Sequence, residues 1–245
     1  MDKLKEHWQS KNIMEWHRKQ FFEPKRNLVY FERFLSAHQN LRTQYVLDLA
    51  CGGGAEDVYL VSKNPGLRIK GLDYVDSAFA IFEELASEDM KSVISLSKGD
   101  WFNMDEKYVN AFDGVISLET LSWLEDWKEP IQRIIDINPR WICLSSLFYE
   151  GKISYQIKLR DYEQTESKDG FDESYYNIYS IPILREFLYE RGYKTFDYEK
   201  FQIDIDIPRP SHMGTGTYTV NTEQGERLQI SGALQMPWYF VYAER

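Results

Sequence analysis

Short apolar runs alternate with stretches of helical periodicity through the first 150 residues of the chain. The runs are nearly continuous and rich in β-branched residues, which predicts strands buried on both faces. Between them, apolar side chains recur every three or four positions, which predicts helices. Strands are expected at 45–50, 68–73, 92–97, 112–118 and 140–148, and helices at 56–64, 76–86 and 129–137. We expect Asn27 to cap an earlier helix and Asp76 to cap the helix at 76–86.

The pattern changes after residue 150. Residues 150–177 are polar and rich in tyrosine without a clear period, which we interpret as an insertion or lid that is helical in part. Pro182 and Gly192 flank an apolar helical stretch in the order that helices favour, proline first and glycine last. Strands are expected at 194–205 and 237–243, and a hairpin at 216–232 that turns at Gln224 and Gly225.

Strands that alternate with helices predict an α/β fold, in which a mostly parallel sheet carries helices on both faces. Because no repeat or low-complexity linker interrupts the 245 residues, we expect one domain.

Charge and composition narrow the function. The net charge of −10 and the lack of a long basic run argue against nucleic acid as the partner. No apolar run is long enough for a membrane span, and the N-terminus has no apolar signal segment, so a cytoplasmic location is expected. Cys51 and Cys143 lack ligand spacing and are expected to pack as small apolar side chains in a reducing compartment. The four histidines also lack ligand spacing, so no metal is expected.

The segment "YVLDLACGGGAED" at 45–57 carries the chemistry. In an open α/β sheet a glycine loop after a strand faces a ligand at the carboxyl ends of the strands. A dinucleotide fingerprint would need a third glycine at position 57, where Asp57 stands. Glu56 and Asp57 at a helix N-terminus would also repel a pyrophosphate. A cationic adenosyl ligand without phosphate fits better, and S-adenosylmethionine (SAM) carries a sulfonium and an ammonium group.

The same segment resembles the first signature of class I SAM-dependent methyltransferases, an acid followed by glycines, here from Asp48 to Gly54. Asp73 at the end of the second strand, and "FDGVISLETLSWL" at 112–124, resemble later sequence motifs of that family. The chain departs from the pattern at Glu56, where a third glycine is usual. The resemblance implies a Rossmann-like fold: a mostly parallel seven-stranded sheet with an antiparallel last strand.

The resemblance also implies site residues. Asp73 would bind the ribose hydroxyls, Asp100 the adenine amino group, and Trp101 would stack on or wall the adenine. The complete set expected at the cofactor is Asp48, Ala50, Cys51, Gly52, Gly54, Asp73, Tyr74, Asp100, Trp101 and Leu118. Trp16, His17 and Phe21 resemble a cap helix that closes over SAM.

Within the single domain, the resemblance implies a helical cap at 1–40, a SAM-binding core at 41–148 and acceptor-side insertions at 149–180 and 205–235. Methyl transfer needs alignment and, for a hydroxyl nucleophile, a base. Glu119 and His212 are candidate bases. The expected acceptor side consists of Trp123, Tyr149, Tyr155, Tyr176, Tyr179 and Arg209.

The expected partner is a small-molecule acceptor of a methyl group on oxygen or nitrogen. The C-terminal segment resembles methyltransferases encoded with bacterial surface-polysaccharide genes, which implies a sugar nucleotide or polysaccharide precursor. Two alternatives stay open, an NAD(P)-dependent oxidoreductase and a non-catalytic SAM-binding protein. We expect a monomer or a homodimer.

Overall fold

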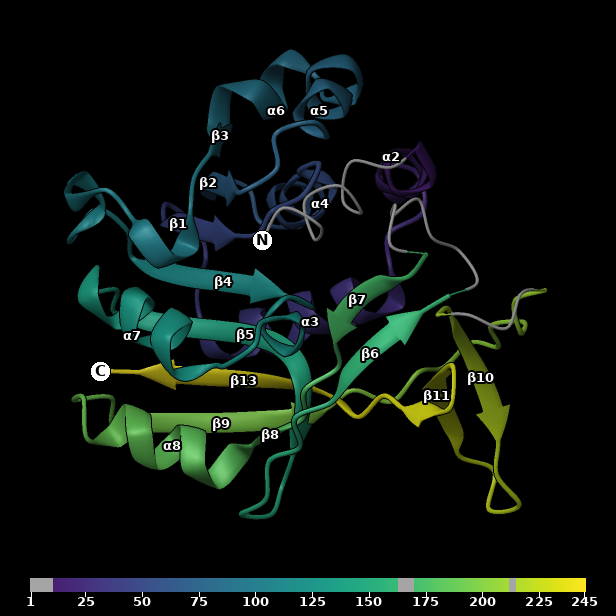
Figure 1. Ribbon diagram of the computed structural model, residues 1–245. Coiled ribbons are helices and arrows are strands. Elements are labelled where there is room, and N and C mark those ends of the chain that lie inside the picture. The colour runs from purple at the N-terminus through teal and green to yellow at the C-terminus, as the bar shows by residue number, and fades with distance from the viewer. Residues whose placement is uncertain (1–10, 163–169, 212–214) are drawn as a thin grey trace.

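A computed structural model describes residues 11–162, 170–211 and 215–245, and its centre is a single large sheet (Figure 1). Along the sheet the strands lie in the order β3 (Ile94–Lys98), β2 (Arg68–Asp73), β1 (Tyr45–Leu49), β4 (Gly114–Leu118), β5 (Trp141–Tyr149), β13 (Trp238–Glu244) and β9 (Thr195–Lys200). The two-residue strand β8 (Tyr179–Ser180) pairs with β5 in addition. β3, β2, β1, β4 and β5 are parallel to one another, and β13 runs antiparallel to both β5 and β9. The expected Rossmann-like fold with an antiparallel last strand is confirmed.

Helices cover both faces of this sheet and divide the core in two. The first core cluster contains side chains of α3 (Arg26–His38) and α4 (Ala55–Lys63), and α5 (Phe79–Leu85) adds to it. The second contains side chains of α7 (Lys128–Asp136) and α8 (Ile181–Tyr189). β1 shows how the strands serve both, because Val46 belongs to the first cluster and Leu47 to the second. Alternation along a strand sends neighbouring side chains to opposite faces.

Shorter helical elements lie in the connections around the strands. They are α6 (Glu88–Val93) and the 3-10 turns η1 (Trp101–Asn103), η2 (Glu106–Tyr108) and η3 (Leu121–Trp123).

Two expected helix caps are wrong. Helix α3 begins at Arg26, so Asn27 lies inside its first turn and is buried, where its side-chain oxygen accepts a hydrogen bond from Ser145 at 3.0 Å. Helix α5 begins at Phe79 behind Ala78, and the carboxylate of Asp76 pairs instead with Lys98. A tertiary partner outweighed the local capping preference in both cases. The helix with Pro182 in its first turn is confirmed as α8.

The tyrosine-rich insertion forms strands rather than the expected partial helix. β6 (Lys158–Asp161) and β7 (Asp172–Tyr175) pair as an antiparallel ribbon. The predicted hairpin is confirmed as β10 (Thr217–Asn221) and β11 (Arg227–Ser231), and β12 (Leu234–Gln235) extends it. Ion pairs across β6 and β7, such as Lys158 with Glu173, hold a ribbon whose sequence lacks a clear apolar period.

The two ribbons are joined to each other. Thr215 donates from its amide and its hydroxyl to Asp161 at 2.6 and 2.8 Å, and the Tyr176 hydroxyl lies 3.0 Å from that of Ser231. In Figure 1 the arrows of β1 and β4 point toward the side of the molecule where these ribbons and the helix α2 (Lys11–Gln20) lie. The carboxyl edge of the parallel sheet is therefore the edge that the additional elements approach.

Across the described ranges, no helix combines the length and apolar character that crossing a membrane requires.

The sheet makes one close approach that only glycine permits. A Cβ at Gly114 would overlap the indole of Trp141, which is fully buried and donates its ring N–H to Gln44 at 2.8 Å. We expect Gly114→Ala to lower the free energy of unfolding by about 1–3 kcal/mol, because the indole must leave its packed position. Urea unfolding measures this. Gly151→Ala is the matched control, since the three atoms nearest to its Cβ all belong to the ring of Tyr149, which is 43% exposed rather than enclosed. Equal stability of the two variants would contradict the packing argument.

Candidate functional site

The glycine loop after β1 turns through left-handed backbone conformations. φ is 65° at Ala50, 54° at Gly52 and 74° at Gly54, and Gly54 is the residue that precedes α4. The amides of Ala50 and Cys51 donate to the Leu72 carbonyl at 2.8 and 3.2 Å, so the loop is fastened to the end of β2. The chain bends sharply here because two of the three positions are glycines, which adopt positive φ at little cost.

Cys51 packs beneath this loop. It is buried, and a Cβ on Gly71 of β2 would lie 2.7 Å from its sulfur. Burial, together with the nearby carboxylates of Asp57 and Asp48, raises the pKa of the Cys51 thiol. A neutral, enclosed thiol is a packing group, and contact with a ligand falls to the Cys51 backbone.

Asp73 at the end of β2 braces the loop. One of its carboxylate oxygens accepts the Gly52 amide at 2.9 Å and the other accepts the Val75 amide at 2.8 Å. Burial raises the pKa of this carboxyl, although the amide hydrogen bonds oppose the effect. The Tyr74 amide also bonds to this carboxylate, and since a carboxylate has about four acceptor positions, one remains for a ribose hydroxyl. Tyr74 follows and is 42% exposed.

Two further carboxyl groups, Asp48 on β1 and Asp57 in the first turn of α4, are 1% and 0% exposed. Among the described residues, none of their four oxygens has a hydrogen-bond partner, and each carboxyl shifts the pKa of the other, so a hydrogen bond between the two is the pairing left to them. Such a bond requires a shared proton. Burial raises the pKa of Asp57 to about 7, although the bond to Asp48 opposes the shift, and burial followed by the charge of Asp57 raises that of Asp48. Unpartnered buried carboxyls next to a ligand loop suit a cationic ligand.

The N-terminal helix α2 lies over the loop. His17 is buried, and its Cε1 would be 2.6 Å from a Cβ on Gly52, so the imidazole rests directly on the glycine backbone. Burial, then the charge of Lys25, lowers the pKa of His17 to about 4, so the ring is neutral near pH 7. Arg18 on the same helix forms a two-point ion pair with Glu84 of α5. Trp16 is 41% exposed, and Phe21 packs at the margin of the first core cluster.

Lys25, which the sequence analysis did not single out, connects this cap to the core. Its ammonium lies 3.0 Å from Glu56 and 2.7 Å from Glu119, and 4.4 Å from the centre of the Trp16 ring. Burial alone would lower the pKa of Lys25, but the two carboxylates outweigh it and the pKa is raised. The side chains of all three ion-paired residues are mostly buried. Because Glu56 and Glu119 lie 31 and 94 positions from Lys25 in the chain, no local sequence pattern indicates these ion pairs.

The same contact changes the expectation for Glu119. Glu119 directly follows β4 and has φ of 56°, and its carboxylate forms an ion pair with Lys25. In this arrangement it is an ion-pair partner rather than an unengaged base. The other candidate base, His212, lies outside the described residues.

Of the two residues expected at the adenine after the third strand, Trp101 is placed differently from the expectation. Asp100 precedes η1 and accepts the Phe102 amide at 2.9 Å. The Trp101 indole points into the second core cluster and donates to the Pro130 carbonyl at 2.9 Å, so it packs against α7 rather than forming an open platform for adenine. Leu118 ends β4 and is buried.

The aromatic residues expected on the acceptor side separate into three groups. Trp123 and Tyr176 contact edge to face at 4.3 Å, where β7 meets η3. Tyr149 and Tyr155 are 43% and 46% exposed and form a second edge contact at 6.4 Å. Tyr179 is buried in the second core cluster, where its hydroxyl donates to the Leu124 carbonyl.

Arg209 lies away from these rings, over the Tyr218 ring on β10 at 5.2 Å. Among the described residues, no three His, Cys, Asp or Glu side chains are grouped as metal ligands.

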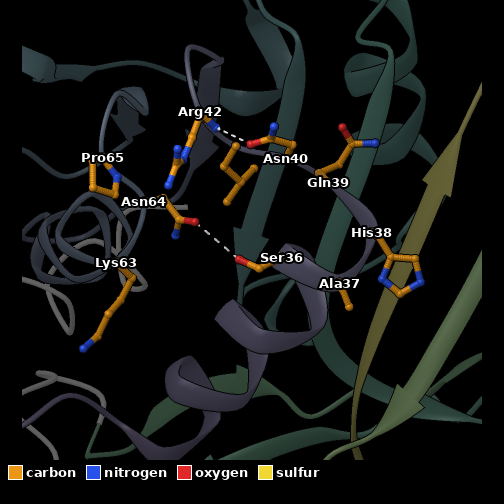
Figure 2. Close-up of a pocket in the computed structure, with 10 residues that line it drawn as sticks. Ser36, Ala37, His38, Gln39, Asn40, Arg42, Lys63, Asn64 and Pro65 are labelled. Carbon is orange, nitrogen blue, oxygen red and sulfur yellow. Dashed lines mark hydrogen bonds between the residues drawn. The ribbon is translucent and has the colours of Figure 1, made fainter.

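A cavity of about 360 Å³ lies at the other edge of the sheet, between the segment that leads from α3 into β1 and the end of α4. Figure 2 shows Ser36 and Arg42 on the first segment and Lys63 and Asn64 on the second. It contains none of the predicted site residues. Ligands of open α/β sheets bind at the carboxyl edge, so the glycine loop remains the candidate site.

Comparison with known proteins agrees with this geometry. The family model described as "Methyltransferase domain" matches residues 42–169. No curated protein matches the chain significantly.

Three solved structures illustrate the likeness in fold. Magnesium protoporphyrin IX methyltransferase of Synechocystis PCC 6803, with bound S-adenosylhomocysteine (SAH), has 14% identity, a TM-score of 0.56 and coverage of 99% of this chain and 98% of its own. Phosphoethanolamine N-methyltransferase 2 of Haemonchus contortus, also with SAH, has 16% identity, a TM-score of 0.57 and coverage of 81% and 46%. A putative sarcosine dimethylglycine methyltransferase of Galdieria sulphuraria has 16% identity, a TM-score of 0.52 and coverage of 71% and 62%.

The chain thus spans less than two thirds of the length of the last two proteins. Because the family model covers more than half of this chain, the chain belongs to the methyltransferase-domain family, and its likeness to these structures shows the class I SAM-dependent methyltransferase fold.

Proposed function

We propose that this protein transfers a methyl group from SAM to an oxygen or nitrogen of a small-molecule acceptor. One observation carries the proposal: two buried carboxyls without a donor, Asp48 and Asp57, lie beneath a left-handed glycine loop at the carboxyl edge of the sheet. A ligand with an ammonium and a sulfonium group is attracted by this charge, whereas the pyrophosphate of a dinucleotide is repelled.

Each cofactor part then has a proposed partner. Asp73 would bind the ribose with the acceptor capacity that its three amide bonds leave open. The backbone from Ala50 to Gly54 would hold the methionine end, with Leu118 at the end of β4 beside it. Asp100 and the adjoining backbone would meet the adenine. Bound SAM supplies an electrophilic methyl group, and the chain's own contribution is alignment and the exclusion of water.

The N-terminal cap is proposed to supply that exclusion. His17 lies on Gly52, and Lys25 ties the start of α3 to Glu56 of α4 and Glu119 after β4. We propose that Glu119 serves this fastening and that residues 1–40 form the cap over a core at 41–148. The ribbons within 149–180 and 205–235 would form the acceptor side, where Trp123 and Tyr176 meet.

For the acceptor we propose a sugar nucleotide or polysaccharide precursor, with Arg209 as the contact for its phosphates. The Arg209 guanidinium lies over the Tyr218 ring, and no carboxylate within the described ranges forms a salt bridge with it, so its charge is available to an anion. Arg160, by contrast, is paired with Glu173. A guanidinium stacked on an aromatic ring supports an anionic acceptor with a flat group.

The cofactor assignment predicts a loss of binding when Asp73 is changed. Removing a charged hydrogen-bond acceptor costs about 1.5–3 kcal/mol, so Asp73→Ala and Asp73→Asn are expected to weaken SAM and SAH binding about 10–100-fold in isothermal titration calorimetry. Asp136→Ala, on the exposed face of α7, is the control. Binding of NAD without any heat from SAM or SAH in the folded wild-type protein would overturn the proposed function.

The cap assignment predicts that Lys25 matters far more than its neighbour Arg18. Lys25→Met leaves two mostly buried carboxylates without their cation, which we expect to cost about 3–5 kcal/mol of unfolding free energy. It should also weaken SAM binding. Arg18→Met removes only an exposed ion pair and should change stability little. Chemical unfolding and calorimetry on both variants test this, and equal effects would exclude the fastening role.

The acceptor assignment predicts formation of SAH from SAM in the presence of UDP- or GDP-sugars. Arg209→Ala should raise KM for these acceptors about tenfold, with the SAM Kd unchanged, since a contact to a charged group contributes about 1.5–3 kcal/mol. Arg227→Ala, whose partner is Asp206, is the control on the same ribbon. Turnover of amines alone, with no anionic acceptor used, would contradict the sugar-nucleotide proposal and leave methyl transfer standing.

A further inference from the structure

We propose that Asp48 and Asp57 form a buried proton-holding pair that makes cofactor binding proton-coupled, with one proton released to solvent as the cationic cofactor binds. The inference rests on the proposed function and adds Asp57 to its site as a positioning residue. Neither carboxyl touches solvent, so the pair acts on the ligand through its charge beneath the loop.

The first step is the count of charges around the pair. The negative charges of Glu56 on α4 and Asp73 on β2 help to raise the pKa of Asp48. The charge of Glu56 also helps to raise the pKa of Asp57. Glu119 after β4 is a further carboxylate, and its charge acts to raise the pKa of Glu56. Lys25 is the cation facing this group, and it is shared between Glu56 and Glu119. His17 above the loop is uncharged near pH 7, and the Cys51 thiol is neutral.

The second step is the geometry of the pair. All four oxygens are enclosed and have no N–H or hydroxyl donor from the described residues, so two ionised carboxylates here would face each other without compensation. A single proton between them satisfies one oxygen on each side and reduces the charge from two to one. Two interacting carboxyls commonly share one proton in this way, and the titration belongs to the pair.

The third step is the effect of a ligand. SAM brings two positive groups and one carboxylate to the loop above the pair, which favours the doubly ionised form. By linkage, a group that loses a proton on binding makes affinity rise with pH until the empty site has lost that proton too. Burial raises the pKa of both carboxyls, and the charge of Asp57 adds to the rise at Asp48, so the empty pair still holds its shared proton near pH 7 and affinity should rise with pH through that range.

The test is calorimetry of the wild-type protein with SAM in buffers of different ionisation enthalpy. We expect release of about one proton per bound SAM near pH 7, and a Kd that improves about tenfold per pH unit there, until the empty pair loses its shared proton at higher pH. SAH lacks the sulfonium charge and should release fewer protons. SAM binding without proton release in any buffer would overturn this inference and leave the proposed function intact, whereas absence of SAM binding would overturn both.

Asp57→Asn separates this role from a purely structural one. The amide donates to Asp48 permanently, so proton release should disappear and the SAM Kd should become nearly independent of pH, about tenfold weaker than wild type near pH 8. Glu223→Gln, an exposed acid at the β10–β11 turn, is the control and should keep the wild-type profile. If Asp57→Asn does not fold, Asp48→Asn provides the same test from the other side. Proton release by a folded variant equal to wild type would contradict the pair.

Discussion

The structure depends on how the chain accommodates concentrated negative charge at the carboxyl edge of its sheet. Asp48, Glu56, Asp57 and Asp73 all lie within the few residues that form and brace the glycine loop, and each of their pKa values is raised chiefly by burial. A folded protein tolerates this only with compensation, because unpaired buried charge is costly. The compensation comes from Lys25, from backbone amides on Asp73 and from the bond between Asp48 and Asp57. A cationic cofactor would complete it.

This constraint explains why the cap belongs to the site. Lys25 comes from outside the sheet, and its ammonium reaches carboxylates on α4 and after β4 that would otherwise face each other. The same segment brings the neutral His17 onto Gly52, at a spacing that any side chain on that glycine would prevent. The cap and the loop are thus shaped to each other, and a change at Gly52, Lys25 or His17 affects both.

The acceptor side follows a different logic. Its two ribbons are joined by polar contacts, Asp161 to Thr215 and Tyr176 to Ser231, rather than by a separate apolar core. They rest on the core where β7 meets η3, next to Trp123. Apolar side chains of the ribbons, among them Leu159 and Leu234, pack against the first core cluster, so the acceptor side shares the core of the sheet.

The sequence by itself determined the elements of the sheet, the cofactor loop and the family. Alternating apolar strands and periodic helices carry local signals, and Asp48 to Gly54 is a contiguous motif in which Gly52 and Gly54 adopt positive φ at little cost. Only the tertiary structure decided that Lys25 meets Glu56 and Glu119, that Asp57 faces Asp48, and that Tyr179 and the Trp101 ring belong to the core. It also decided that the polar insertion forms strands. These contacts join residues far apart in the chain, or depend on which way a side chain faces, and neither leaves a periodic trace in a single sequence.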